Sequence, residues 1–219
     1  MNVFNQLYLV LSLLALVAYI PNVFKKPGYI QLTVLYLVVL LLTFLASIYS
    51  TNILELRNNL FIFHVATPLE YTILSLLYRS VIVNGMLKKI ITFSIPFFLV
   101  LSIASSIFIQ PLNTNNSYTI ILASVIIVFL TLFFLRETLL LQPVTILHRF
   151  PMFWISVGIL FYYTGGFVIE GMLNYMITHS MELARRTFII GYIFKYLLFI
   201  LFIIGAFFNR KSSGEIITR

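Results

Sequence analysis

The stretch TIILASVIIVFLTLFFLRETLLL, residues Thr119–Leu141, decides the fold class of this chain. It has no charged residue before Arg136 and Glu137 near its end, and it consists mainly of Ile, Leu, Val and Phe. A helix of about 20 mostly apolar residues is long enough to cross the hydrocarbon core of a bilayer. We therefore interpret this stretch as a transmembrane helix.

Six more apolar stretches of similar length fill most of the 219-residue chain. Hydrophobic residues make up 61% of the sequence and charged residues only 9%, whereas soluble domains have roughly 25% charged residues. The sequence predicts an all-α polytopic membrane protein with seven transmembrane helices at 3–24, 29–50, 60–84, 90–110, 119–141, 152–176 and 187–208. The predicted domains are a transmembrane domain at 1–208 and a cytoplasmic tail at 209–219. Polar loops such as 51–59, 111–118 and 177–186 join the predicted spans.

Lysine and arginine are distributed unevenly between the two sets of loops. Positive residues accumulate in cytoplasmic loops, so we read the net charge of +8 as a topology signal rather than as nucleic-acid binding. One set of loops and the tail contain Lys25, Lys26, Lys88, Lys89, Arg149, Arg210, Lys211 and Arg219, whereas the other set contains Arg57, Arg185 and Arg186. This predicts an outside N-terminus and a cytoplasmic C-terminus, and the short loops are typical of a protein of the bacterial inner membrane.

Several ionisable side chains are predicted to lie within the outer half of the bilayer. Charged groups there cost several kcal/mol and mark functional sites by default. Glu70 and Lys195 lie about 15 and 12 Å below the predicted outer face, so we expect them to pair directly or through one water or tyrosine. The predicted ligand-binding residues of this outward-facing pocket are His64, Glu70, Tyr163, Glu170 and Lys195. The alternative is that these polar groups only fix the packing of the helices.

A second polar group is predicted at the cytoplasmic ends of the helices. Arg79 ends one predicted span, Glu137 ends another and Trp154 begins a third. An Arg79–Glu137 pair would tie two spans together, and we predict these three residues as a switch that changes with the conformation of the bundle. The alternative is that arginine and tryptophan serve as ordinary anchors at the membrane interface.

Several classes of chemistry are disfavoured by the residues that the chain lacks. It has no cysteine, and its three histidines lie on separate segments, so neither a metal nor another cofactor is predicted. No nucleophile stands beside a base, which argues against an enzyme. A retinal-binding opsin is disfavoured because Gly191 stands one turn before Lys195, where an acidic counter-ion is expected.

Two stretches carry a family resemblance: HVATPLEY at 64–71, and PMFWI at 151–155 continuing through Gly158 to YYTGG at 162–166. They resemble a group of small seven-span bacterial membrane proteins of unassigned function. Such proteins are similar to the seven-span input modules of bacterial sensor kinases. The resemblance implies a free-standing sensor module in the lipid bilayer.

The function predicted from these observations is a non-catalytic membrane receptor or sensor. Its ligand would be a small molecule, a lipid or a peptide, and it would signal through a partner protein or a homo-oligomer, without nucleic acid. Two alternatives stay open. One is a small secondary transporter or proton-coupled carrier that uses Glu70 as its titrating group, and the other is a membrane enzyme that acts on lipid.

Overall fold

A computed structural model describes residues 3–22, 28–56, 58–141 and 147–211 of the chain. In this part of the chain it contains helices and their connections, and no strand. The elements are α1 (Val3–Tyr19) with the short 3-10 helix η1 (Ile20–Asn22), α2 (Gly28–Asn52), α3 (Phe61–Val81), α4 (Gly85–Phe108), α5 (Ser117–Leu141), α7 (Pro151–His179) and α8 (Met181–Lys211). The predicted all-α class is confirmed.

The helices have the length and composition of membrane spans. Six of them, α2 to α5, α7 and α8, are long and apolar enough to cross a bilayer. The chain is therefore a multi-pass membrane protein by this criterion. Helix α1 is also apolar but has only 17 residues, which is the lower end of the range for a span. The seventh span and the orientation of the bundle therefore stay predictions.

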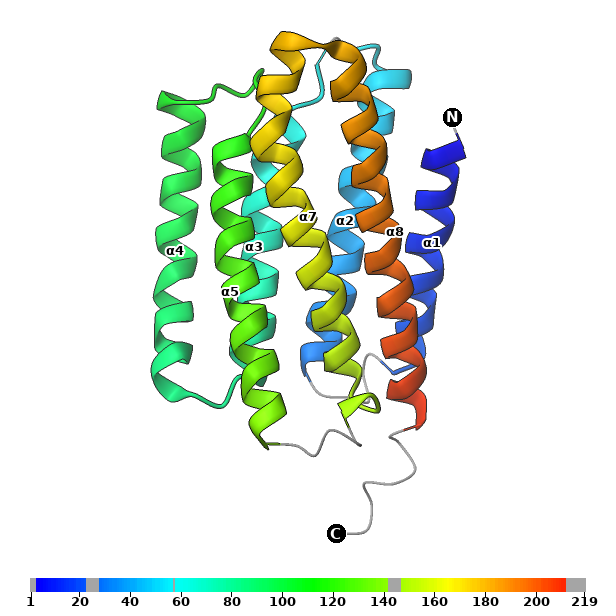
Figure 1. Ribbon diagram of the computed structural model, residues 1–219, viewed down its shortest axis with the longest axis vertical. Coiled ribbons are helices and arrows are strands. Elements are labelled where there is room, and N and C mark those ends of the chain that lie inside the picture. Colours follow the sequence, from blue (N-terminus) through cyan, green and yellow to red (C-terminus); the bar gives the residue numbers. More distant parts are fainter. Residues whose placement is uncertain (1–2, 23–27, 57, 142–146, 212–219) are drawn as a thin grey trace.

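Six helices form a closed ring, and the seventh lies outside it (Figure 1). Around the ring the neighbours are α1, α2, α3, α5, α7 and α8, and α8 packs back on α1. Among the described residues, helix α4 packs mainly against α3 and more weakly against α5, and its outer face exposes Phe93, Phe97 and Val100. We call the end with the start of α1 and the α2–α3, α4–α5 and α7–α8 connections the upper end (top of Figure 1), and the opposite end the lower end.

Small residues bring α7 and α8 close together. A Cβ atom built on Gly165 of α7 would lie 2.5 Å from a ring carbon of Phe194 in α8, so no larger residue fits without a shift. Gly158 lies seven residues earlier on the same side of α7, and its Cβ position is 3.3 Å from the Cβ of Leu201. Glycines at such positions let two membrane helices pack closely.

The lower half of the ring is filled by side chains. Tyr36, Leu74, Tyr78, Ile159 and Phe202 are fully buried there, and they come from α2, α3, α7 and α8. Two hydrogen bonds join helices within this packing: the Thr131 hydroxyl donates to the Tyr78 oxygen at 2.8 Å, and the Tyr78 hydroxyl lies 3.5 Å from the Ser156 oxygen. The lower half of the ring is therefore closely packed below the site described next.

Two predicted loops are wrong in detail. Residues 177–186 were predicted as a loop, but α7 continues to His179 and α8 begins at Met181, with only Ser180 between them. No glycine or proline interrupts this stretch, and the Ser180 hydroxyl accepts a hydrogen bond from the Leu183 N–H as a helix cap. Lys88 and Lys89 were predicted to precede a helix, but they lie inside the start of α4. The predicted tail begins inside α8, and its residues 212–219 lie outside the described part of the chain.

Candidate functional site

A cavity of about 640 Å³ lies inside the ring in its upper half. All six ring helices contribute to its lining, and α4 contributes none. Thr51 and Asn52 at the end of α2 belong to the lining, as does Asn59 in the following connection, so the cavity reaches the upper end. The volume falls in the range of about 300–1,000 Å³ that is typical of small-molecule sites.

Glu70 lies near the middle of α3, about 14 Å below the start of that helix, and its side chain lines the cavity. The Tyr163 hydroxyl of α7 donates to the Glu70 carboxylate at 3.2 Å. The Tyr36 hydroxyl of α2 donates in turn to the Tyr163 oxygen at 3.5 Å. This short chain of hydrogen bonds therefore connects three helices at the floor of the cavity.

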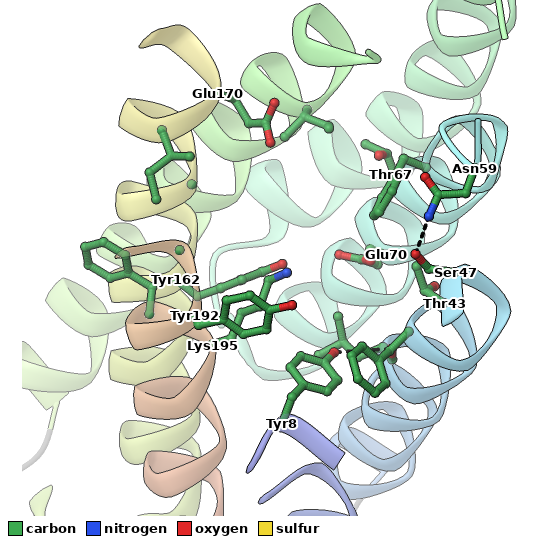
Figure 2. Close-up of a pocket in the computed structure, with 18 of the residues that line it drawn as sticks. Tyr8, Thr43, Ser47, Asn59, Thr67, Glu70, Tyr162, Glu170, Tyr192 and Lys195 are labelled. Atoms are coloured by element: carbon green, nitrogen blue, oxygen red, sulfur yellow. Dashed lines mark hydrogen bonds between the residues drawn. The ribbon is translucent and has the colours of Figure 1, made fainter. Parts of the chain in front are cut away.

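Lys195 of α8 approaches the cavity from the side opposite Glu70 (Figure 2). Its ammonium lies 5.4 Å from the centre of the Tyr192 ring and 5.8 Å from that of Tyr8, within range of cation–π attraction. The Lys195 ammonium forms no ion pair within 4.0 Å and no hydrogen bond with the described residues. The ion pair found among these residues joins two other side chains, Arg186 and Glu182. Glu70 and Lys195 therefore do not pair directly, and the expected pairing through one water or tyrosine stays a prediction.

The two tyrosines beside Lys195 are themselves held in place. The Tyr192 hydroxyl donates to the Asn5 side-chain oxygen at 2.6 Å, and the Tyr8 hydroxyl donates to the Leu40 carbonyl at 3.3 Å. The Tyr8 ring also stacks on Phe44, with centroids 4.1 Å apart. Because these contacts fix both rings, the surroundings of the lysine are organised before any ligand arrives.

Glu170 lies higher on α7, two turns above Tyr163, and also lines the cavity (Figure 2). Its carboxylate accepts a hydrogen bond from the Asn115 side chain at 3.0 Å. Asn115 belongs to the α4–α5 connection, so this bond fastens that connection to α7 at the rim. A second asparagine acts similarly on the other side, where the Asn59 side chain donates to the Ser47 hydroxyl at 2.6 Å.

His64 does not line the cavity, although it was predicted with the ligand-binding residues. It is buried, and its Nδ1 lies 2.8 Å from the Ser106 hydroxyl of α4. Its Nε2 lies 3.1 Å from the carbonyl oxygen of Thr114. Both ring nitrogens are therefore engaged in joining α3 to α4 and to the α4–α5 connection.

The predicted Arg79–Glu137 pair at the lower end is wrong. Arg79 is exposed, and its Nε donates to the Thr92 hydroxyl of α4 at 2.8 Å. Glu137 accepts instead from two backbone N–H groups, those of Val83 at 2.8 Å and Asn84 at 3.1 Å. These N–H groups belong to the turn between α3 and α4, where the backbone has no helical acceptor for them.

Trp154, the third predicted member of this switch, forms no hydrogen bond with either of the other two in the described structure. Its indole N–H donates to the His148 carbonyl at 2.7 Å. Its ring is nearly parallel to that of Phe208, with centroids 6.2 Å apart. Trp154 therefore joins the start of α7 to the end of α8.

The cavity combines aromatic and apolar walls with three charged groups, and this suits binding rather than metal chemistry. Among the described residues no group of three His, Cys, Asp or Glu side chains is placed to hold a metal ion.

Two residues of α1 that line the cavity, Asn5 and Tyr8, were missed in the sequence analysis. Asn5, Tyr8 and Ser12 follow steps of three and four, which place them on one helix face. Comparisons with protein-family models, curated proteins and solved structures gave no match.

Proposed function

We propose that this chain is a non-catalytic membrane receptor that binds a small molecule in the upper cavity and transmits binding through the ring helices. The proposal rests on one observation: charged side chains line a cavity that reaches the upper end and has a packed floor. A receptor needs such a one-sided site, whereas a carrier must open its site to both faces of the membrane. We place the upper end outside and the lower end in the cytoplasm of a bacterial cell.

The packing below the cavity supports a one-sided site. Tyr36, Leu74 and Phe202 are fully buried directly below the level of Glu70, and Ile155 and Leu198 are equally buried beside them. Protein interiors packed in this way leave few voids larger than a water molecule. A ligand that reaches Glu70 from the upper end therefore meets a closed floor.

The hydrogen bonds at the floor supply a route from ligand to helices. Tyr163 donates to Glu70 and accepts from Tyr36, so one hydroxyl links α7 to α3 and α2. A cationic ligand group that binds the open side of Glu70 neutralises the carboxylate and so weakens the hydrogen bond from Tyr163. Binding would thereby change the relative stability of two arrangements of these helices, which is how a ligand shifts a conformational equilibrium. A partner protein at the lower end would read the change.

Binding is favoured over catalysis by the residues that line the cavity. No histidine belongs to the lining, and the Ser47 hydroxyl is held by Asn59 at the rim rather than by a base. Nucleophilic catalysis by a serine, threonine or lysine needs a base within reach of the hydroxyl or amine. The hydroxyl that meets a carboxylate in the lining is the phenol of Tyr163, which is held at the closed floor by Glu70 and Tyr36. Lys195 is the one amine in the lining, and no carboxylate lies within 4.0 Å of it.

One observation favours a carrier as the second candidate. The Ser75 hydroxyl is buried in the lower half without a hydrogen-bond partner among the described residues. On α3, Ser75 lies between Glu70 above and Tyr78 below, and Tyr78 is joined to Ser156 and Thr131. Buried hydroxyl groups normally have a partner, which an internal water can supply. A hydrated column of this kind would give protons a path below the cavity.

Thiol labelling distinguishes the two candidates, because the chain has no cysteine of its own. Gly166 lines the cavity and has open space at its Cβ position, whereas Ser75 lies below the floor. We expect a small hydrophilic thiol reagent to label Gly166→Cys in native membranes and to leave Ser75→Cys unmodified. Labelling of both at similar rates, together with Glu70-dependent proton or solute flux in reconstituted vesicles, would reject the receptor and support the carrier.

A further inference from the structure

We propose that the upper cavity recognises a zwitterion, with the anionic group of the ligand at Lys195 and its ammonium at Glu70. This inference rests on the proposed binding function of the cavity and names the chemical class of the ligand. It follows from three features: the unmet bonding capacity of Lys195, the open side of Glu70, and the separation of the two charges.

Lys195 lacks the acceptors that an ammonium needs. An ammonium has three N–H donors, and none of them meets an acceptor on the described residues. The Tyr8 and Tyr192 rings stabilise the positive charge from the side, but their hydroxyls donate to Leu40 and Asn5. The remaining side of the ammonium faces the cavity (Figure 2). A carboxylate or phosphate of a ligand is the group that satisfies these donors best.

Glu70 has the opposite requirement. A carboxylate has about four acceptor sites, and Tyr163 donates to one oxygen of Glu70. The side chain is half-buried because the rest of it faces the cavity. Glu170 offers further acceptor capacity nearer the rim, where Asn115 supplies one donor. An ammonium on the ligand would satisfy Glu70, and a second donor on the ligand could reach Glu170.

The two charges do not neutralise each other directly. Glu70 and Lys195 face one another across the cavity, but they form no ion pair within 4.0 Å (Figure 2). Opposite charges held apart in a partly apolar site remain costly until each receives a partner. An apolar ligand leaves both charges unpaired. An anion is repelled by the carboxylates of Glu70 and Glu170, and a cation is repelled by the ammonium of Lys195. A zwitterion with its charges reversed relative to the site pairs with both.

The rest of the lining requires an apolar portion on the ligand. Leu40, Phe44, Ala123, Ile169 and Phe194 surround the charged groups. Burial of apolar area is worth about 25 cal/mol per Å², so a small apolar side chain or tail adds affinity beyond the charge pairs. Two sources supply this chemistry: a free amphipathic amino acid, and the headgroup of a zwitterionic lipid with part of its chain.

The test is a thermal-unfolding titration of the full chain in detergent with matched ligands. Leucine is the free zwitterion, leucinamide has only the ammonium, and 4-methylpentanoate has only the carboxylate. Lysophosphatidylethanolamine and lysophosphatidylglycerol form the lipid pair, in which only the first is a zwitterion. We expect stabilisation by leucine or by lysophosphatidylethanolamine, and little by the singly charged compounds. The member that stabilises identifies the free or the lipid source.

Variants assign the two charge contacts. Glu70→Gln should weaken the zwitterion at least about tenfold and make it no better than the matching anion. Lys195→Met should weaken it similarly and make it no better than the matching cation. The matched controls are Glu137→Gln and Lys89→Met, because both residues lie outside the cavity at the lower end. Binding by the controls should stay within about twofold of the original chain, since no contact in the cavity changes.

The zwitterion proposal is overturned if a singly charged compound stabilises as strongly as its zwitterion. It is also overturned if Glu70→Gln binds the zwitterion unchanged, or if no member of the series stabilises the chain. None of these outcomes decides the receptor proposal. That proposal is rejected by a different result, namely labelling of Ser75→Cys together with Glu70-dependent proton or solute flux. A singly charged compound that stabilises in a Lys195-dependent manner would retain the binding site and replace only the ligand class.

Discussion

Replacing Gly165 with alanine should destabilise the protein, whereas the same change at Gly166 should not. The Cβ of an alanine at 165 would lie 2.5, 2.6 and 2.7 Å from three ring carbons of Phe194, about 1 Å inside ordinary contact. At Gly166 the same atom meets nothing within 4 Å. The two positions share one helix and differ only in the side they face, so each is a control for the other.

The expected magnitude combines two effects. Alanine is better than glycine in a helix by about 1 kcal/mol, and this gain applies at both positions. Overpacking of a well-packed contact typically costs about 1–3 kcal/mol, and this cost applies only at Gly165. We therefore expect Gly165→Ala to be about 1–3 kcal/mol less stable than Gly166→Ala.

The assay compares the free energy of unfolding of the two variants in detergent. Both are unfolded side by side, either by heating or by denaturant titration. Phe194 also lines the cavity, so a ring displaced by Gly165→Ala should also weaken ligand binding. Removing the ring by Phe194→Ala should abolish the cost of Gly165→Ala, because the clashing atoms are gone. Equal stability of Gly165→Ala and Gly166→Ala would refute the close packing of α7 on α8 that is inferred here.

Two further predictions follow from the hydrogen bonds and the topology. Tyr163→Phe should cost about 1–3 kcal/mol of stability because it removes a donor to Glu70. Tyr162→Phe should cost little, because the Tyr162 hydroxyl has no hydrogen-bond partner in the described structure. Denaturant titration measures both losses, and equal losses would contradict the Tyr163–Glu70 hydrogen bond. In intact cells an impermeant thiol reagent should label Asn113→Cys in the α4–α5 connection and spare Met86→Cys at the lower end; the reverse pattern would place the upper end in the cytoplasm.

The polar stripe of α3 shows why the site was only partly predictable. The spacing in the sequence places His64, Thr67, Tyr71, Ser75 and Tyr78 along one side of the helix, and such a polar stripe predicts a side that faces a pocket. In the structure the upper part of the stripe divides between two neighbours. Thr67 lines the cavity beside Glu70, whereas His64 and Tyr71 form hydrogen bonds with serines of α4. Helical spacing gives the phase of a stripe, but it does not say which helix lies opposite.

The charged residues were predictable for a different reason. A carboxylate or an ammonium in the middle of an apolar stretch is costly, so Glu70, Glu170 and Lys195 stand out in the sequence without any structure. Tyr163 lies seven residues before Glu170, so the spacing in the sequence places both on one side of the same helix. All four line the cavity. The contacts of these residues were not predictable, because Glu70 meets Tyr163 rather than Lys195, and Lys195 meets the rings of Tyr8 and Tyr192.

The sequence by itself determined the all-helical membrane class, because in lipid a long apolar segment must satisfy its backbone hydrogen bonds internally and a helix does so. It also determined which charged groups lie within long apolar stretches. Only the tertiary structure decided that α4 stands outside the ring, that α8 closes it on α1, and that the upper half is hollow. These features depend on contacts between segments far apart in the chain, and no local pattern of residues encodes which helices become neighbours.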